Sequence, residues 1–126
     1  MNVVDSSGWL EYFGDSLNAK FFAPPIEAVG ELVVPAITLY EVYKLMSKQR
    51  GTDYAMQAVA AMRQGSVVDL TAGLAVTSAQ VSISEGLPMA DSIILATARA
   101  HGATLWTQDA DFAKIAGVKY VARKAG

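Results

Sequence analysis

The sequence predicts an α/β protein in which a central parallel sheet of four to five strands is covered by helices on both faces, as a three-layer α/β/α sandwich. Short apolar runs that fit buried strands alternate along the chain with longer segments whose apolar residues recur at helical spacing. Because helices rather than tight turns separate the strands, neighbouring strands are expected to run parallel. No internal repeat or low-complexity linker divides the 126 residues, so we expect a single domain over residues 1–126.

The chain is expected to begin with a buried strand and a short helix. Residues 2–4 form an apolar run that ends in a polar turn, and a short helix around Trp9 follows. The next segment, residues 16–30, has helical stretches. We expect Pro24 and Pro25 to break them, because proline lacks the backbone donor and clashes with the preceding helical turn.

A second buried strand over residues 31–35 is expected to lead into a helical hairpin. The first helix, residues 36–48, carries apolar side chains at helical spacing, and Leu45 is expected among those that face inward. Gly51 fits the end of this helix. A second helix over residues 52–64 follows a short turn, which predicts that the two helices pack antiparallel.

The second half of the chain repeats the alternation of strands and helices. Its most apolar helix begins near Pro88, and an almost wholly apolar helix is expected to pack against the sheet. Asp91 lies one turn before Ile94 and Leu95 and is expected to share their face. In chain order, the expected elements are a strand over 66–70, helices over 71–84 and 88–101, a strand over 103–107, a short helix over 109–116 and a strand over 118–121.

Composition excludes several kinds of chemistry. The chain has no cysteine and one histidine, His101, which excludes disulfides, thiolate zinc sites and mechanisms that need two imidazoles. A Ser-His-Asp triad stays open only through His101, which lies at an expected helix end where solvent exposure is the ordinary outcome. The net charge of −2 does not fit a protein that clamps nucleic acid by bulk charge, so any such contact is expected to be local.

The distribution of apolar residues bears on location and assembly. The longest apolar stretch, residues 92–98, is far shorter than the roughly 18–20 residues that span a bilayer. The first five residues lack the basic and apolar regions of a secretory signal, so we expect no membrane contact and a cytoplasmic location. The 52% hydrophobic content is high for a soluble domain and suggests that a partner covers some apolar surface.

Four carboxylates are expected at one edge of the sheet: Asp5, Glu41, Asp91 and Asp109. Ligands of parallel sheets bind beyond the carboxyl ends of the strands, where loops and helix starts meet. Oxygen ligands without nitrogen or sulfur favour Mg²⁺ or Mn²⁺. Two carboxylates about 4 Å apart repel by roughly 4 kcal/mol at an effective dielectric of about 20, and a cation removes that cost. Metal-assisted hydrolysis of a phosphodiester is the reaction that matches such a site.

Each carboxylate also has an ordinary structural role open to it. Asp5 and Asp109 can cap the helices that follow them, and Asp91 is favoured in a first helical turn by the helix dipole. Glu41 can form a surface ion pair with Lys44, three residues later. Taken singly these acids are weak signals, whereas four of them at one sheet edge form a more specific pattern.

Four segments of the chain resemble the motifs of PIN-domain ribonucleases, and their order and spacing are similar to the VapC toxins of toxin-antitoxin pairs. The segments are Val3-Val4-Asp5-Ser6-Ser7, residues 35–42, residues 87–98 and residues 105–112. The resemblance covers essentially the whole chain and implies a PIN-like fold. It also implies that an acidic quartet binds Mg²⁺ or Mn²⁺ and carries catalysis, with Asp111 as an accessory metal ligand: Asp5, Glu41, Asp91 and Asp109.

The same resemblance implies roles for further residues and for partners. Ser7 and Thr107 would support the first and last aspartates, although ordinary hydrogen bonding in turns explains them equally well. The substrate would be RNA, cut by a metal-activated water, and the partners would be a cognate antitoxin that blocks the site and a second copy in a homodimer. Four basic residues fit contacts with RNA phosphates or solvated surface positions: Lys44, Lys48, Arg99 and Lys114.

Aromatic content and competing folds leave one other function open. Seven aromatic residues supply more aromatic surface than one small core needs, which fits an antitoxin groove or a dimer seam: Trp9, Tyr12, Phe13, Phe21, Phe22, Tyr40 and Tyr43. A haloacid-dehalogenase reading fails because the segment after the first strand lacks a second aspartate, and a receiver-domain reading lacks paired acids there. The alternative that stays open is a catalytically idle PIN-like module that binds RNA or protein.

Overall fold

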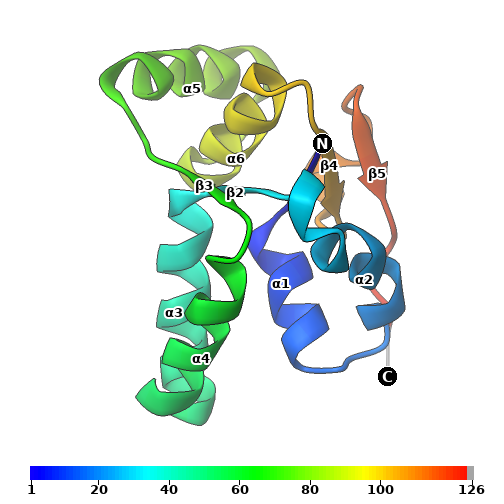
Figure 1. Ribbon diagram of the computed structural model, residues 1–126. Helices are drawn as coiled ribbons and strands as arrows, with labels where there is room; N and C mark the ends of the chain where they lie inside the picture. Colours follow the sequence, from blue (N-terminus) through cyan, green and yellow to red (C-terminus); the bar gives the residue numbers. More distant parts are fainter. Residues whose placement is uncertain (125–126) are drawn as a thin grey trace.

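The computed structural model describes residues 1–124 and confirms a three-layer α/β/α arrangement around a parallel sheet (Figure 1). All five strands pair in parallel, but hydrogen bonds divide them into a three-stranded part of order β1-β4-β5 and a two-stranded part of order β2-β3. One parallel bridge, between Asn2 and Leu32, joins the two parts. The strands are β1 (Asn2–Val4), β2 (Val33–Pro35), β3 (Ser66–Val68), β4 (Thr104–Thr107) and β5 (Val118–Tyr120).

The helices pack as consecutive pairs around this sheet. The pair α3 and α4 forms the expected antiparallel hairpin, and α5 packs against α6 at the other end of the molecule (Figure 1). Within residues 1–124, no helix has the length and apolar character required to cross a bilayer. The helices are α1 (Ser6–Phe13), α2 (Ala19–Glu27), α3 (Ala36–Arg50), α4 (Thr52–Met62), α5 (Ala72–Glu85) and α6 (Met89–Ala100), with 3₁₀ turns η1 (Val29–Glu31) and η2 (Ala110–Phe112).

Neighbouring residues on the strands supply the two apolar cores. Val3 and Val33 belong to the core shared with α5 and α6, whereas Val4 and Val34 belong to the core shared with α1, α2, α3 and α4. This division follows from the strand geometry, because successive side chains point to opposite faces of a sheet. Every residue of α6 from 92 to 98 is buried, as its apolar sequence predicts.

The expected break at Pro24 and Pro25 is wrong, because α2 continues through both prolines. The two prolines remove backbone donors from the second half of a short helix. Burial of Phe22 and Ile26 on the same element holds that half against the core. The helix then closes through a hydrogen bond from the Ala28 N–H to the Pro24 carbonyl, 3.2 Å long. Packing therefore outweighs the local preference of proline here.

Two other expectations need correction. Leu45 is 38% exposed, because the inward row of α3 consists of Thr38, Val42 and Met46, spaced four residues apart. Thr38 fits this row because its buried hydroxyl is paired, donating to the Pro35 carbonyl at 2.7 Å. The helix expected over residues 109–116 is only the single 3₁₀ turn η2.

Candidate metal centre

The acidic residues of interest lie where strands end and helices begin. Asp5 directly follows β1, and Asp109 comes two residues after the end of β4. Asp91 is the third residue of α6, and Glu41 lies in the second turn of α3. Since β1 and β4 are parallel neighbours, their carboxyl ends bring Asp5 and Asp109 to the same edge.

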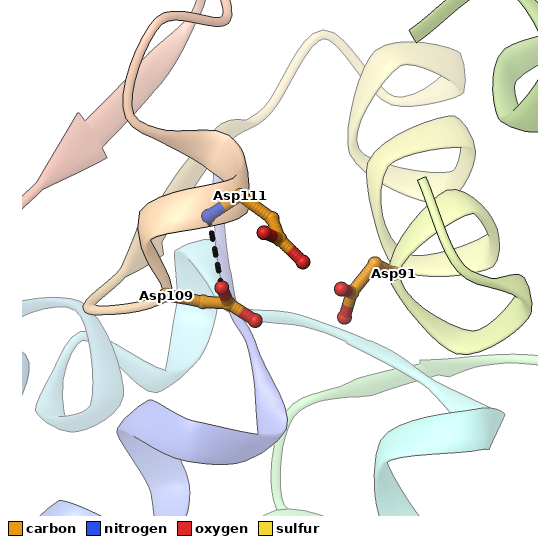
Figure 2. Close-up of side chains that lie close together, drawn as sticks. All are labelled: Asp91, Asp109 and Asp111. Carbon is orange, nitrogen blue, oxygen red and sulfur yellow. Dashed lines mark hydrogen bonds between the residues drawn. The ribbon is translucent and has the colours of Figure 1, made fainter. Parts of the chain in front are cut away.

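Two of these carboxylates, those of Asp91 and Asp109, converge on one point together with the carboxylate of Asp111. Ligand oxygens of Asp91, Asp109 and Asp111 all lie within 4.8 Å of one another. Figure 2 shows Asp91 on α6 facing Asp109 and Asp111, which come from the η2 segment. The Asp111 backbone N–H donates to Asp109 Oδ1 at 2.9 Å, so the helix-capping role considered for Asp109 is real. The cap orients one Asp109 oxygen, and the carboxylate still faces Asp91.

The pKa of Asp91 reflects both its burial and the negative charge around it. Its pKa is raised from 3.8 to about 7, first by burial and then by the charges of neighbouring acids. Those acids, in decreasing order of effect, are Asp109, Asp5, Glu41 and Asp111. The predicted quartet and the accessory acid therefore act on one another electrostatically.

Asp5 is the most deeply buried of these acids. It is 3% exposed and accepts hydrogen bonds from the Gly8 N–H at 2.9 Å, the Ser7 hydroxyl at 2.9 Å and the Thr107 hydroxyl at 2.6 Å. Burial raises the Asp5 pKa to about 6, and the hydrogen bonds from Thr107, Gly8 and Ser7 oppose that rise. Asp5 thus caps α1, and the same carboxylate binds the start of α1 to the end of β4.

Thr107 connects the first and last aspartates of the predicted quartet. Its hydroxyl donates to Asp5 Oδ2 and accepts from the Asp109 backbone N–H at 2.9 Å. Thr107 is fully buried, so rotation of this hydroxyl is restricted to these partners. The arrangement fixes the backbone of the segment that carries Asp109 relative to the end of β1.

Glu41 is held by a partner that sequence reasoning missed. The Ser6 hydroxyl donates to Glu41 Oε1 at 2.5 Å, across 35 residues of chain. The ion pair considered between Glu41 and Lys44 does not form, since the ion pair recorded within residues 1–124 joins Arg99 and Glu85 at 3.4 Å. The only sequence signal for Ser6 was its place beside Asp5 in the polar turn.

A buried polar network behind η2 was also missed. Asn18 and Gln108 are both 2% exposed, and Asn18 Nδ2 donates to Gln108 Oε1 at 2.9 Å. Gln108 Nε2 in turn donates to Glu11 at 3.2 Å. These bonds hold the residue between Thr107 and Asp109, which makes the network part of the support for the acidic cluster. A glutamine between two residues of the last motif was the only signal in the sequence.

The sequence matches the PIN domain family over residues 3–118. This chain belongs to the PIN-domain family. The match runs from the second residue of β1 to the first residue of β5 and includes the acidic residues of the site described above. No curated protein matches the sequence significantly.

Solved structures reproduce the same PIN fold over nearly the full chain. A toxin-antitoxin complex from Klebsiella pneumoniae gives a TM-score of 0.80 at 24% identity, covering 94% of this chain and 96% of that chain. VapC20 from Mycobacterium tuberculosis, a sarcin-ricin loop cleaving toxin, gives 0.77 at 19% identity, covering 92% and 95%. The DNA-bound VapBC complex from Salmonella typhimurium gives 0.71 at 16% identity, covering 97% and 98%.

The donor set of this PIN domain fits a hard divalent cation. Asp91, Asp109 and Asp111 offer carboxylate oxygens close enough to share one ion, without nitrogen or sulfur ligands. The pKa of Asp91 is raised first by burial and then by the neighbouring acids, and a cation between these carboxylates would offset both the burial and the repulsion.

Proposed function

We propose that this PIN-domain protein is a metal-dependent endoribonuclease that hydrolyses RNA phosphodiester bonds as the toxin of a type II toxin-antitoxin system. The observation that carries the proposal is the convergence of the Asp91, Asp109 and Asp111 carboxylates within 4.8 Å. Family membership over residues 3–118 supports it. Further support comes from the likeness in fold to a toxin described as cleaving the sarcin-ricin loop.

The proposed cofactor is Mg²⁺ or Mn²⁺. When bound, the cation would supply an activated water and neutralise the charge that develops on the phosphate. Asp91, Asp109 and Asp111 are the residues proposed to hold it, together with Glu41 and Asp5 of the same acidic centre. Ser6 orients Glu41, and Ser7 and Thr107 orient Asp5, so the chain presets the direction of these carboxylates.

A cleavage assay tests this function. With Mg²⁺ or Mn²⁺ the wild-type protein should cleave RNA, and Asp91→Asn should lower the rate roughly 100-fold or more because it removes one charged ligand. Asp69→Asn is the matched control, since Asp69 is exposed and lies outside the acidic centre. Equal RNA breakdown by wild type and Asp91→Asn would contradict the proposal and leave the idle binding module as the alternative.

The proposed partners are an antitoxin and a second copy of the chain, in the cytoplasm. Several structures of similar fold are complexes of a toxin with its antitoxin, which supports the first. For the homodimer, the best-suited surface is an apolar groove of about 570 Å³ between α5 and α6. Ile83 and Met89 line it and are 86% and 72% exposed, and Val76 nearby on α5 is 62% exposed. Apolar side chains gathered in this way are typical of surfaces that a partner covers.

A further inference from the structure

We propose that the exposed face of α3 beside the acidic centre binds single-stranded RNA, with Tyr40 stacking on a base while Lys44 and Lys48 hold phosphates. We call this face, formed by Tyr40, Glu41, Lys44, Leu45 and Lys48, the α3 strip. The inference rests on the proposed ribonuclease function. It specifies that RNA reaches the acidic centre along α3 and that the RNA bound there is single-stranded.

The α3 strip is continuous with the acidic centre. Its five residues line one groove of about 260 Å³. Tyr40, Lys44 and Lys48 follow one another at four-residue intervals, so they lie along one side of the helix over about 12 Å. Glu41 belongs both to this groove and to the set of acids that raise the Asp91 pKa. An RNA strand that lies in this groove therefore leads to the acidic centre through Glu41.

The exposure of Tyr40 points to a ligand with a flat face. Tyr40 is 62% exposed and contributes to neither apolar core, although the chain buries other aromatic residues well. The Lys44 ammonium lies 5.7 Å from the centroid of the Tyr40 ring, which places an aromatic surface and a positive charge side by side. Proteins that bind single strands combine these two features, one for bases and one for the backbone. A duplex keeps its base faces stacked internally and offers no partner for the ring.

Unpaired charge on the strip complements a phosphate backbone. Within residues 1–124, neither Lys44 nor Lys48 has an acidic partner within 4.0 Å, whereas Arg99 is paired with Glu85. The net charge of the protein is −2, so general attraction does not account for RNA binding, and a local pair of free cations is needed. The lysines lie on the side of Glu41 away from the start of α3, so phosphates are attracted on that side.

Binding of a short fluorescein-labelled oligoadenylate, followed by anisotropy without divalent metal, tests the role of Tyr40. All variants carry Asp91→Asn to prevent cleavage. Tyr40→Ala should weaken binding roughly tenfold, and Tyr40→Phe should retain wild-type affinity because the ring is kept. Tyr43→Ala is the matched control, since Tyr43 is on the same helix, 36% exposed, and does not line the groove.

Salt dependence separates the lysines from the tyrosine. Lys44→Gln and Lys48→Gln should each lower the slope of log affinity against log salt by about 0.7, the value for one phosphate contact on a single strand. Tyr40→Ala should leave that slope unchanged, because stacking releases no counterions. If Tyr40→Ala weakened binding only by destabilising the fold, it would also lower the melting temperature of the protein, which circular dichroism measures.

Oligonucleotides lacking one base at a time test stacking directly. Removal of the base at one position of the oligonucleotide should weaken its binding to the Asp91→Asn protein. In the protein that also carries Tyr40→Ala, removal of the same base should no longer weaken binding. If the wild type cleaves RNA while Tyr40→Ala binds it as tightly as the parent does, the α3 strip does not hold RNA and is left to a protein partner. In that case the ribonuclease proposal stands. If the wild type neither binds nor cleaves RNA, both proposals are wrong.

Discussion

Asp5 and Asp91 both have raised pKa values, but their surroundings differ. Asp5 is buried among three hydrogen-bond donors that favour its charged form and partly offset the burial. Asp91 has no such donor among the causes of its shift, and four neighbouring acids add to the effect of burial. The charged form of Asp5 is therefore partly stabilised by hydrogen bonds, whereas the charged form of Asp91 is relieved only by a proton or a cation.

The pH dependence of stability should report the state of Asp91 in metal-free protein. The folded state holds the Asp91 proton up to a pKa of about 7, whereas an unfolded chain releases it near 3.8. The folded state therefore binds more protons between these values, and stability falls as pH rises through that window. Asp91→Asn should be more stable than wild type at pH 8 by about 1–2 kcal/mol, allowing for solvent screening of a partly exposed group.

Urea unfolding at several pH values, with a chelator present, measures this difference. The advantage of Asp91→Asn should vanish near pH 4, because the wild-type carboxyl is then protonated in the folded state. Asp69→Asn should follow the wild-type curve throughout. Parallel curves for wild type and Asp91→Asn would show that the carboxylates do not repel one another as described.

Thr107→Val tests how much the hydrogen bonds of Thr107 with Asp5 and Asp109 contribute to stability. The change keeps the shape of a fully buried side chain but removes the donor to Asp5 and the acceptor for the Asp109 N–H. We expect a loss of about 2 kcal/mol in the free energy of unfolding, since hydrogen bonds to charged groups are worth about 1.5–3 kcal/mol. The measurement is chemical denaturation at pH 8, where Asp5 is charged.

Thr97→Val is the matched control for Thr107→Val. Thr97 is equally buried, but its hydroxyl donates only to the Ile93 carbonyl within α6. The loss there should be below about 1 kcal/mol. Equal losses at the two positions would mean that the bond to Asp5 has no special weight.

At the scale of elements, sequence periodicity accounts for the long helices and fails where tertiary contacts decide. The helices α3, α4 and α6 follow from their apolar spacing and from the glycine after α3. Proline preference alone could not show that α2 continues, because its stability comes from Phe22 and Ile26 in the core. The Ser6 and Gln108 contacts were equally hidden, since their partners lie 35 and about 90 or more residues away in the sequence.

Gly8 illustrates how close the packing of α1 is. A Cβ at this position would lie 2.6 Å from both Phe22 Cε1 and Val4 Cγ1. Gly8→Ala should therefore lower the free energy of unfolding by about 1–3 kcal/mol through overpacking, even though alanine favours the helix. The readout is the midpoint of thermal or urea unfolding.

Gly73→Ala supplies the control for Gly8→Ala. Gly73 lies in α5, and a Cβ there would meet nothing within 4 Å. The same substitution should stabilise the protein by about 0.5–1 kcal/mol, because glycine is the poorer helix former. Stabilisation by both substitutions would show that the α1 contact yields without cost.

At the scale of the whole molecule, the apolar groove between α5 and α6 should decide the oligomeric state. Ile83→Glu places a charge on a side chain that is 86% exposed in the single chain, so folding should be unaffected while a dimer through this face is lost. Size-exclusion chromatography with light scattering should show a dimer for wild type and a monomer for Ile83→Glu. Met56→Glu, on α4 and 59% exposed, should remain dimeric. A monomeric wild type would contradict this assembly.

The order of the elements and the positions of the acids could be predicted from the sequence, but the shape of the sheet could not. Runs such as residues 2–4 and 31–35 indicate strands without showing how many hydrogen bonds they share. The sheet is divided because the isolated bridge between Asn2 and Leu32, the residue before β2, takes the place of a continuous ladder between β1 and β2. Likewise, Asp111 was expected as an accessory acid, yet the fold brings one of its oxygens within 4.8 Å of oxygens of both Asp91 and Asp109.

The acidic centre takes its residues from both parts of the divided sheet, the β1-β4-β5 part and the β2-β3 part. Glu41 is carried by the helix that follows β2, whereas Asp5 and Asp109 follow β1 and β4 on the other side of the seam. The Ser6–Glu41 hydrogen bond and the two apolar cores also join these two parts of the sheet. A cation bound by acids from both parts of the sheet would require the folded arrangement of both, so the midpoint of unfolding should rise with cation concentration.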